Sequence, residues 1–534
     1  MTGELTVQDL DHLGIVAGII DEIGIVEVIN QRLGQSSREK VSAGVIVKGM
    51  LLNGLGFVSA PLYMFEKFFQ GIATEHLLGE GVKAGQLNDD RLGDVLDQLY
   101  EAGLSETFVE ISLQAVKKFE VEVATGHMDS TSFHVDGKYE REEAGAVEIT
   151  YGYSRDHRPD LKQFVMNLIC VGDGDIPVMM EIANGNQADK ARFAELLQEF
   201  KEQWRFDGLC VADAALYSAE NLTAMAGLKW LTRVPLSIKQ AGELAETTIE
   251  LQNSKLKGYA TTESVSEYGG VSQRWILVES QARRKSDIEK LDKKLEQIRH
   301  KCHQDLQTLS VQDFACESDA TAAAQKLSAK MTWHQLSDIQ VVEKRHYQKA
   351  GKPSKDAIPK RIAYRVTATV TGLEAQISAQ RLRCGRFILA TNILDAAKLN
   401  ADAALCDYKG QQGTERGFRF LKDPLFFASS VFLKSRQRIE ALGMIMALCL
   451  LVYNLGQRQL RLALARTQES IPSQLGKPTD SPTLRWVFQC FMAVHLVIFQ
   501  EVKQIVNLNA SRLHILKFFP ESCRRYYLLP LPDS

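Results

Sequence analysis

Two aspartates are the first residues whose type and setting could support chemistry. Asp129 lies in "GHMDSTSFHV" (126–135) and Asp213 lies in "CVADAAL" (210–216), each at the end of a predicted strand. A carboxylate buried beside an apolar strand is costly unless a cation or hydrogen bonds compensate it, whereas a strand end that opens into a cleft avoids that cost. A single strand-end aspartate commonly caps the next turn or helix. Together, the two carboxylates predict a metal site.

A third carboxylate, Glu415, lies in "YKGQQGTERGFRFLK" (408–422), which has helical spacing. Glu415, Arg419 and Lys422 are separated by four and three residues, so they share one helix face. A solvated, salt-bridged face would give the same local pattern. The distinguishing feature is the spacing Tyr408, two residues, Gln411, three residues, Glu415, six residues, Lys422.

The charge distribution matters more than its sum. The 534 residues are 45% hydrophobic and 24% charged, which is typical of a globular protein of two to four units. A net charge of −3 excludes a uniformly basic nucleic-acid binder. Residues 1–120 hold nine Lys and Arg against 18 Asp and Glu, whereas residues 408–466 hold ten against three. The second segment, which includes Arg416 and Arg419, is the predicted polyanion-binding surface.

Nine cysteines are scattered singly, and no secretory signal pattern stands at the N-terminus. We therefore expect a reducing, cytoplasmic setting. The longest apolar run, residues 441–452, is too short to span a bilayer, so we expect a buried core helix and no membrane partner.

Periodicity predicts a mixed α/β chain interrupted by an inserted domain. We expect an all-helical N-terminal domain over 1–120, in which Ser37 caps a helix. The domain could serve packing or dimerisation, or it could contact DNA with one face. Residues 121–232 predict strands in "VEVATGHMDSTSF", "VEITYGYS" and "QFVMNLICV", followed by alternating helices and strands.

The inserted α+β domain is expected over 233–384, with a short coiled-coil-like helix that carries Ile288, Leu291, Leu295 and Ile298. The Lys-rich run 343–361 is interpreted as a solvated loop, with DNA contact as the alternative. The strand "RFILATNI" should return the chain to the core over 385–470, and a helical region should follow over 471–534.

Other polar or aromatic residues carry weaker signals. His134 and His157 lie near the first strands, where structural histidines are commoner than catalytic ones. The "HKCH" stretch (300–303) lacks a second ligand pair at zinc spacing, and we interpret it as helix surface. Trp275 could stack on an unpaired base, but burial in the inserted domain is the stronger interpretation.

The chain resembles the bacterial insertion-sequence DDE transposases that carry a Tyr-(2)-Arg-(3)-Glu-(6)-Lys signature. Besides residues 408–422, the resemblance rests on "MDSTSF", "YGYSRDHRPDLKQF", "VADAALYS" and "GRFILATN", and it covers most of residues 120–460. Gln411 stands where that family usually has arginine. The resemblance implies a ribonuclease-H-like mixed sheet that is interrupted by an insertion between the second Asp and the Glu.

By the same resemblance, Asp129, Asp213 and Glu415 would be the catalytic and metal-binding triad for two Mg²⁺ ions, with Mn²⁺ able to substitute. Tyr408, Gln411 and Lys422 would contact DNA phosphates, and Arg416 or Arg419 would compensate for the lost arginine. The implied reaction is nicking at the element's ends and strand transfer by the freed 3′-OH. The implied partners are terminal inverted repeats and target DNA, bound by a homodimer associated with the bacterial nucleoid.

Two alternatives remain open. A phosphohydrolase of the haloacid dehalogenase kind would use Asp129 as a nucleophile, and "MDST" is compatible with it, but it has no use for Glu415 and Lys422. A catalytically silent DNA-binding protein derived from a transposase is the other alternative, because Gln411 departs from the signature.

Overall fold

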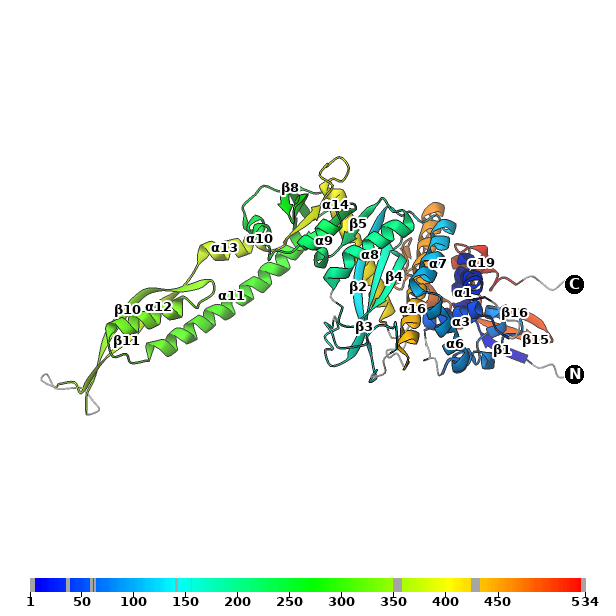
Figure 1. The fold of residues 1–534 in the computed structure, drawn as a ribbon, viewed down its shortest axis with the longest axis horizontal. Coiled ribbons are helices and arrows are strands. Elements are labelled where there is room, and N and C mark those ends of the chain that lie inside the picture. Colours follow the sequence, from blue (N-terminus) through cyan, green and yellow to red (C-terminus); the bar gives the residue numbers. More distant parts are fainter. Residues whose placement is uncertain are drawn as a thin grey trace. The chain divides into compact units, whose positions relative to one another are not determined.

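The computed structural model describes residues 5–34, 39–57, 61, 64–139, 143–154, 156–187, 189–348, 358–423 and 433–529, without the side chains of 189–191 (Figure 1). The chain divides into two compact units. Unit 1 consists of Met1–Thr232, Gly269–Val271 and Cys406–Ser534, and unit 2 consists of Arg233–Tyr268 and Ser272–Leu405.

The centre of unit 1 is the part of a nine-stranded mixed sheet in which the strands follow the order β4-β3-β2-β5-β6. These strands are β2 (Thr125–Val135), β3 (Lys162–Val171), β4 (Ile176–Ala183), β5 (Leu209–Ala212) and β6 (Lys229–Val234). The first three are antiparallel neighbours, whereas β5 runs parallel to both β2 and β6. The near-continuous apolar sequence of β3 is buried along its length, as expected of a strand covered on both faces.

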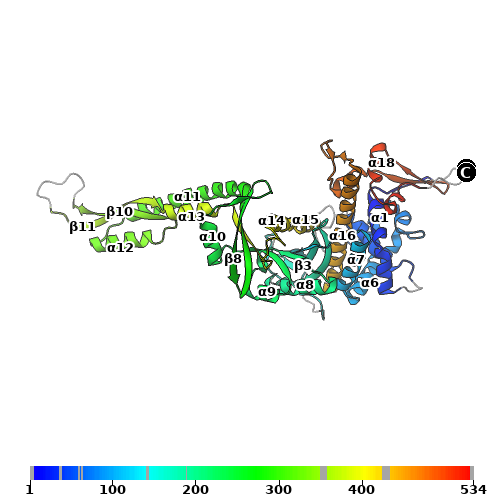
Figure 2. The same ribbon diagram turned by 90° about the horizontal axis from the view of Figure 1, so that it is seen from above.

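Helices cover both faces of this sheet. Phe200 of α8 (Asp189–Trp204) lies against Gly126 of β2, and α9 (Ala219–Ala224) packs beside α8. The opposite face carries α15 (Gln412–Leu421), which packs on β2 and β3, and α16 (Arg436–Thr467). Figure 2 shows α15 and α8 on opposite sides of β3.

The long helix α16 forms the centre of the packing of unit 1. It contacts β4 and the N-terminal helices α1, α3, α6 and α7. Of the described residues, α16 is the one helix that is long and apolar enough to cross a membrane, and 89% of its apolar window is buried within the protein. The predicted buried core helix over 441–452 is thereby confirmed.

The N-terminal region is largely helical and is packed with the C-terminal residues. Its helices are α1 (Leu13–Ile23), α2 (Ile25–Leu33), α3 (Ala43–Leu55), α4 (Phe65–Phe69), α5 (Thr74–Leu78), α6 (Asp89–Glu101) and α7 (Leu104–Lys118). The C-terminal helices are α17 (Leu484–Cys490), α18 (Ala510–Leu516) and α19 (Glu521–Arg524), with the two-residue strands β13 (Ile471–Pro472) and β14 (Pro478–Thr479) before them.

The N-terminal region is helical, but it is not all-helical as was expected, because it begins with a strand. Strand β1 (Leu5–Asp9) pairs with β15 (His495–Phe499), which pairs in turn with β16 (Val502–Val506). Ser42 caps α3, rather than Ser37, which lies outside the described residues. A pairing between strands almost 500 residues apart leaves no local sequence signal.

Unit 2 is an α+β assembly with two sets of paired strands. Its strands are β7 (Gln252–Asn253), β8 (Tyr259–Tyr268), β9 (Val271–Ser280), β10 (His334–His346), β11 (Arg361–Gly372) and β12 (Arg386–Thr391). Its helices are α10 (Lys239–Glu246), α11 (Gln281–Ser310), α12 (Glu317–Ser328) and α13 (Glu374–Arg383), and α14 (Ala401–Gly410) contains the boundary with unit 1.

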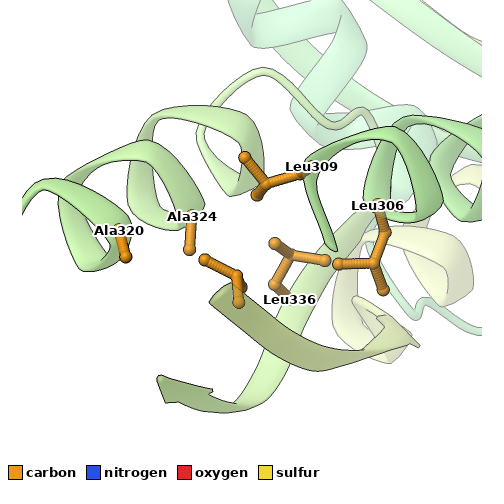
Figure 3. Close-up of a cluster of buried hydrophobic side chains, with 6 residues drawn as sticks. Leu306, Leu309, Ala320, Ala324 and Leu336 are labelled. Carbon is orange, nitrogen blue, oxygen red and sulfur yellow. The ribbon is translucent and has the colours of Figure 1, made fainter. Parts of the chain in front are cut away.

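The end of α11 supplies part of a separate core in unit 2. Leu306 and Leu309 pack with Ala320 and Ala324 of α12 and with Leu336 of β10 (Figure 3). The predicted coiled-coil stripe at Ile288, Leu291, Leu295 and Ile298 is half-buried along α11.

Two predicted elements differ from the structure, and a third agrees with it. "VEITYGYS" forms a single bridge, Thr150 to Gln163, and β4 takes the place of the expected third strand. The stretch "RFILATNI" forms the expected strand, β12, which pairs with β9. The Lys-rich run is not wholly a loop, because its first residues lie in β10 and Arg361 begins β11, while residues 349–357 lie outside the described part. The domain divisions at 120, 232, 384 and 470 stay predictions.

Candidate active site

Asp129 lies within β2 and is 9% exposed. Its Oδ1 accepts a hydrogen bond from the Ser130 backbone N–H at 2.8 Å. Of the buried residues that follow it, Thr131 lies on the same face of the strand as Asp129 and carries a hydroxyl that can donate a hydrogen bond. Such surroundings reduce the cost of burying an anion.

Asp213 follows β5 directly and is half-buried. Its Oδ1 accepts a hydrogen bond from the Ala215 N–H at 2.8 Å, which caps the short 3-10 turn Ala214–Leu216. Its backbone carbonyl accepts a hydrogen bond of 2.6 Å from the Thr232 hydroxyl on β6. Asp213 therefore does cap the turn that follows it, and these hydrogen bonds hold it at the end of β5.

The two aspartates occupy matching positions on neighbouring strands. Met128 and Ala212 are partners in the parallel pairing of β2 with β5, and Asp129 and Asp213 are the next residues of the two strands. Neighbouring strands lie about 4.8 Å apart. The sequence thus places two carboxylates side by side at one point of the sheet.

The helix α15 runs alongside β2. At its start, Nε2 of Gln411 donates a 2.6 Å hydrogen bond to the Met128 carbonyl, and at its end Nζ of Lys422 lies 5.5 Å from the centre of the Phe133 ring. Eleven helical residues rise about 16 Å. Five strand residues span nearly the same length, about 16 Å. Glu415, one turn after Gln411, therefore lies about level with residues 129–130.

Asp129 faces the side of the sheet that α15 covers. Side chains alternate along a strand, so His127, Asp129 and Phe133 point to one face. His127 packs against Gly410, since a Cβ atom there would lie 2.9 Å from the His127 Cε1, and Phe133 contacts Lys422. The face of β2 that carries Asp129 is thus the face that meets α14 and α15.

The three carboxylates do not form a closed metal site. Among the described residues, no group of three His, Cys, Asp or Glu side chains is arranged to hold a metal ion. Glu415 is exposed on α15. The donor set nevertheless fits a hard divalent cation, because all three side chains offer carboxylate oxygens and two of them stand in register.

The residues predicted to contact DNA have different surroundings. Tyr408 is half-buried in α14, and Gln411 is only 6% exposed. Lys422 forms a 2.6 Å ion pair with Asp156, and Arg416 forms a 3.2 Å ion pair with Asp175. Arg419 is exposed and has no side-chain partner among the described residues.

Several cationic side chains of residues 408–466 form ion pairs within unit 1. Fewer of them are therefore available for the predicted polyanion-binding surface. Arg438 makes two hydrogen bonds to the Asp97 carboxylate, at 2.8 and 2.7 Å. Arg458 contacts both oxygens of Asp173 at 2.8 and 2.5 Å. Part of the positive charge of this segment thus balances carboxylates of the acidic N-terminal region and of the β3–β4 turn. Exposed cations such as Arg419 remain for a polyanion.

His127 is a neighbour of the site that the sequence reasoning missed. Burial lowers the pKa of His127 to about 4, and the adjacent Gln411 side chain partly opposes that shift. The imidazole is therefore neutral near pH 7. Its place two residues before Asp129 in an alternating strand was the signal that could have identified it.

The weaker candidates have structural surroundings. His134 contacts Ser154 Oγ at 2.9 Å, and burial lowers its pKa while Asp156 raises it. His157 is exposed. Trp275 is 2% exposed and donates to Gln273 Oε1 at 3.1 Å, so its predicted burial is confirmed. His300 and His303 are exposed on α11, as expected of helix surface.

Two family models match the chain. A family model described as a transposase DDE domain matches residues 125–452, and one described as a domain of unknown function (DUF4277) matches residues 5–113. No curated protein matches the chain. A cryo-EM structure of the piggyBac transposase synaptic complex with hairpin DNA is similar at 10% identity and a TM-score of 0.35, over 98% of this chain and 81% of that chain, a likeness too distant to carry an argument. Because the transposase model matches more than half of the sequence, the chain belongs to the DDE transposase family.

Proposed function

We propose that the protein is an insertion-sequence transposase that cuts DNA at the ends of its element and joins the freed 3′-OH to target DNA. The observation that carries the proposal is the matched placement of Asp129 and Asp213 on β2 and β5, beside α15, the helix that carries Glu415. The sheet order β4-β3-β2-β5-β6, three antiparallel strands followed by two parallel ones, supports a ribonuclease-H-like core.

In this proposal, Asp129, Asp213 and Glu415 hold two Mg²⁺ ions, for which Mn²⁺ substitutes. When bound, the metals supply activation of the attacking hydroxyl and stabilisation of the leaving oxygen. Asp129 and Asp213 are fixed by the sheet, and Glu415 closes toward them from α15. Closure on DNA is the step that would bring the third carboxylate into place, since catalytic contacts often tighten only in the substrate complex.

The exposed cations beside this face would position the DNA backbone. Arg419 offers a free guanidinium, and Lys422 offers an ammonium that exchanges Asp156 for a phosphate. Tyr408 adds a hydroxyl donor. Synapsis of two element ends requires two active sites, and we therefore propose a homodimer on DNA.

The test is incubation of the protein with Mg²⁺ and duplexes that carry the DNA flanking its own coding region. The proposal predicts nicks that leave a 3′-OH at the element's ends, followed by joined products when target DNA is added. A protein that binds these ends without nicking them would be the silent derivative. A labelled aspartyl-phosphate on Asp129 would support the phosphohydrolase instead.

A further inference from the structure

We propose that Gln411 is a positioning residue: it anchors the start of α15 to β2 and thereby sets the place of Glu415 relative to Asp129. This inference rests on the proposed function and replaces the phosphate contact that the resemblance implies for this position. Its basis is the 2.6 Å hydrogen bond from Nε2 of Gln411 to the carbonyl of Met128, the residue that precedes Asp129.

The surroundings of Gln411 favour an anchor over a phosphate ligand. The side chain is 6% exposed, and it carries no charge. One of its N–H groups is already given to the strand, and its carbonyl oxygen would repel a phosphate. A buried, neutral amide that bonds to the backbone serves to fix two elements together.

Two glycines allow the helix start to approach the sheet closely. A Cβ atom at Gly410 would lie 2.9 Å from the His127 ring, and one at Gly413 would collide with the Asp175 carboxylate. The junction of α14 and α15 is therefore seated directly on the strands, with Gln411 at its centre. Within this seating, the hydrogen bond to Met128 links the helix start to the strand of Asp129.

Glu415 depends on this seating. It lies on the exposed face of α15, and its carboxylate has no hydrogen bond or ion pair with another side chain in the described part of the chain. Its position is thus set by the helix alone. Lys422 holds the far end of α15 through Asp156 and Phe133, and Arg416 pairs with Asp175 beside Glu415. The loss of the Gln411 bond would shift the start of the helix relative to β2, and Glu415 with it.

The experiment compares Gln411→Met with Gln412→Met in the full-length protein. Methionine keeps the length and buried volume of glutamine but cannot donate a hydrogen bond. Gln412 is the adjacent exposed glutamine and provides the matched control. Three quantities are measured: Mn²⁺ affinity by electron paramagnetic resonance, the Kd for a duplex of an element end, and the single-turnover rate of nicking.

For Gln411→Met we expect the Mn²⁺ affinity and the nicking rate each to fall roughly 10- to 100-fold, as for other partners that orient metal ligands. The Kd for DNA should stay within about twofold, because no phosphate contact is lost. Gln412→Met should match the wild-type protein in all three measurements. A weakened Kd for DNA with unchanged Mn²⁺ affinity would overturn the inference in favour of a phosphate contact, and so would no change at all.

Gln411→Glu decides the matter if the methionine variant fails to fold. The isosteric carboxyl donates to the Met128 carbonyl only when it is protonated. Its nicking rate relative to the wild-type protein should therefore rise as the pH is lowered, whereas a flat ratio would contradict the anchor. Failure of the proposed function and failure of this inference give different results. If the wild-type protein does not nick DNA, the proposed function is wrong. If the wild-type protein nicks DNA and Gln411→Met is unaffected, only this inference is wrong.

Discussion

Asp129 and Asp213 each follow one member of a register pair, Met128 and Ala212, on two parallel neighbouring strands. Their separation along the sequence is large, but the sheet holds them at one level. Because the pairing is made by backbone hydrogen bonds, the relative position of the two aspartates does not depend on flexible side chains. This rigid pair defines the fixed half of the candidate site, and α15 supplies the other half.

Substitution of either aspartate by asparagine should reduce nicking by more than about 100-fold, because a ligand itself is lost rather than an outer partner. Asparagine keeps the size of the side chain, so the DNA affinity should change little. Gel-shift and cleavage assays on the same preparations measure both quantities. Asp136→Asn, at the exposed end of β2, is the matched control and should behave like the wild-type protein. Full cleavage by Asp213→Asn would limit that residue to its capping role.

Arg419→Gln should weaken DNA binding and lower the slope of log K against log salt by about 0.9, the value for one phosphate contact. The reason is that Arg419 is exposed and free of partners among the described side chains. Arg438→Gln is the contrasting variant, since Arg438 is paired with Asp97. It should leave the salt slope unchanged and lower the melting temperature. Equal salt slopes for Arg419→Gln and the wild-type protein would exclude Arg419 from the DNA surface.

Glu440 should make the folded state less stable as the pH rises. Burial raises the pKa of Glu440 from 4.5 to about 7, the Val147 N–H opposes this shift, and Glu143 adds to it. Between pH 4.5 and 7 the folded protein holds a proton that the unfolded chain has released, so stability falls across that window. The contribution of Glu440 to stability is fully present below pH 4.5.

Glu440→Gln is expected to remove this pH dependence, because the amide can still accept the hydrogen bond from Val147 and does not ionise. At pH 8 the variant should exceed the wild-type protein by an amount on the order of 1 kcal/mol. At pH 4.5 the two should be equal. Urea unfolding at both pH values measures the difference, and a difference that is the same at both would show that the charge of Glu440 is not its cause.

The candidate site was predictable where its signals are local. The apolar stretches at Asp129 and Asp213 predicted the two strands, and the helical spacing predicted the helix that carries Glu415 and Arg419. The expected strand end at Asp129 is wrong, because β2 continues to Val135. Membership in the DDE transposase family, predicted from the same residues, is confirmed by the family match.

The errors arise where distant segments decide the local structure. The alternation in "VEITYGYS" predicted a strand, but Val147 donates to Glu440 on α16 and β4 occupies the edge of β3. The strand at Leu5–Asp9 exists because β15 is there to pair with it. Gln411 could not be recognised as buried from its sequence, since the adjacent Gln412 is chemically identical and exposed.

The central claim is that Glu415 meets Asp129 and Asp213 at one metal position. Iron-directed cleavage tests it most directly: Fe²⁺ replaces Mg²⁺ in the DNA complex, and peroxide with ascorbate then cuts the backbone close to the bound metal. The account predicts cuts near residues 129, 213 and 415 that disappear together in Asp129→Asn. Cuts near 129 and 213 with none near 415, in a complex that still nicks DNA, would contradict it.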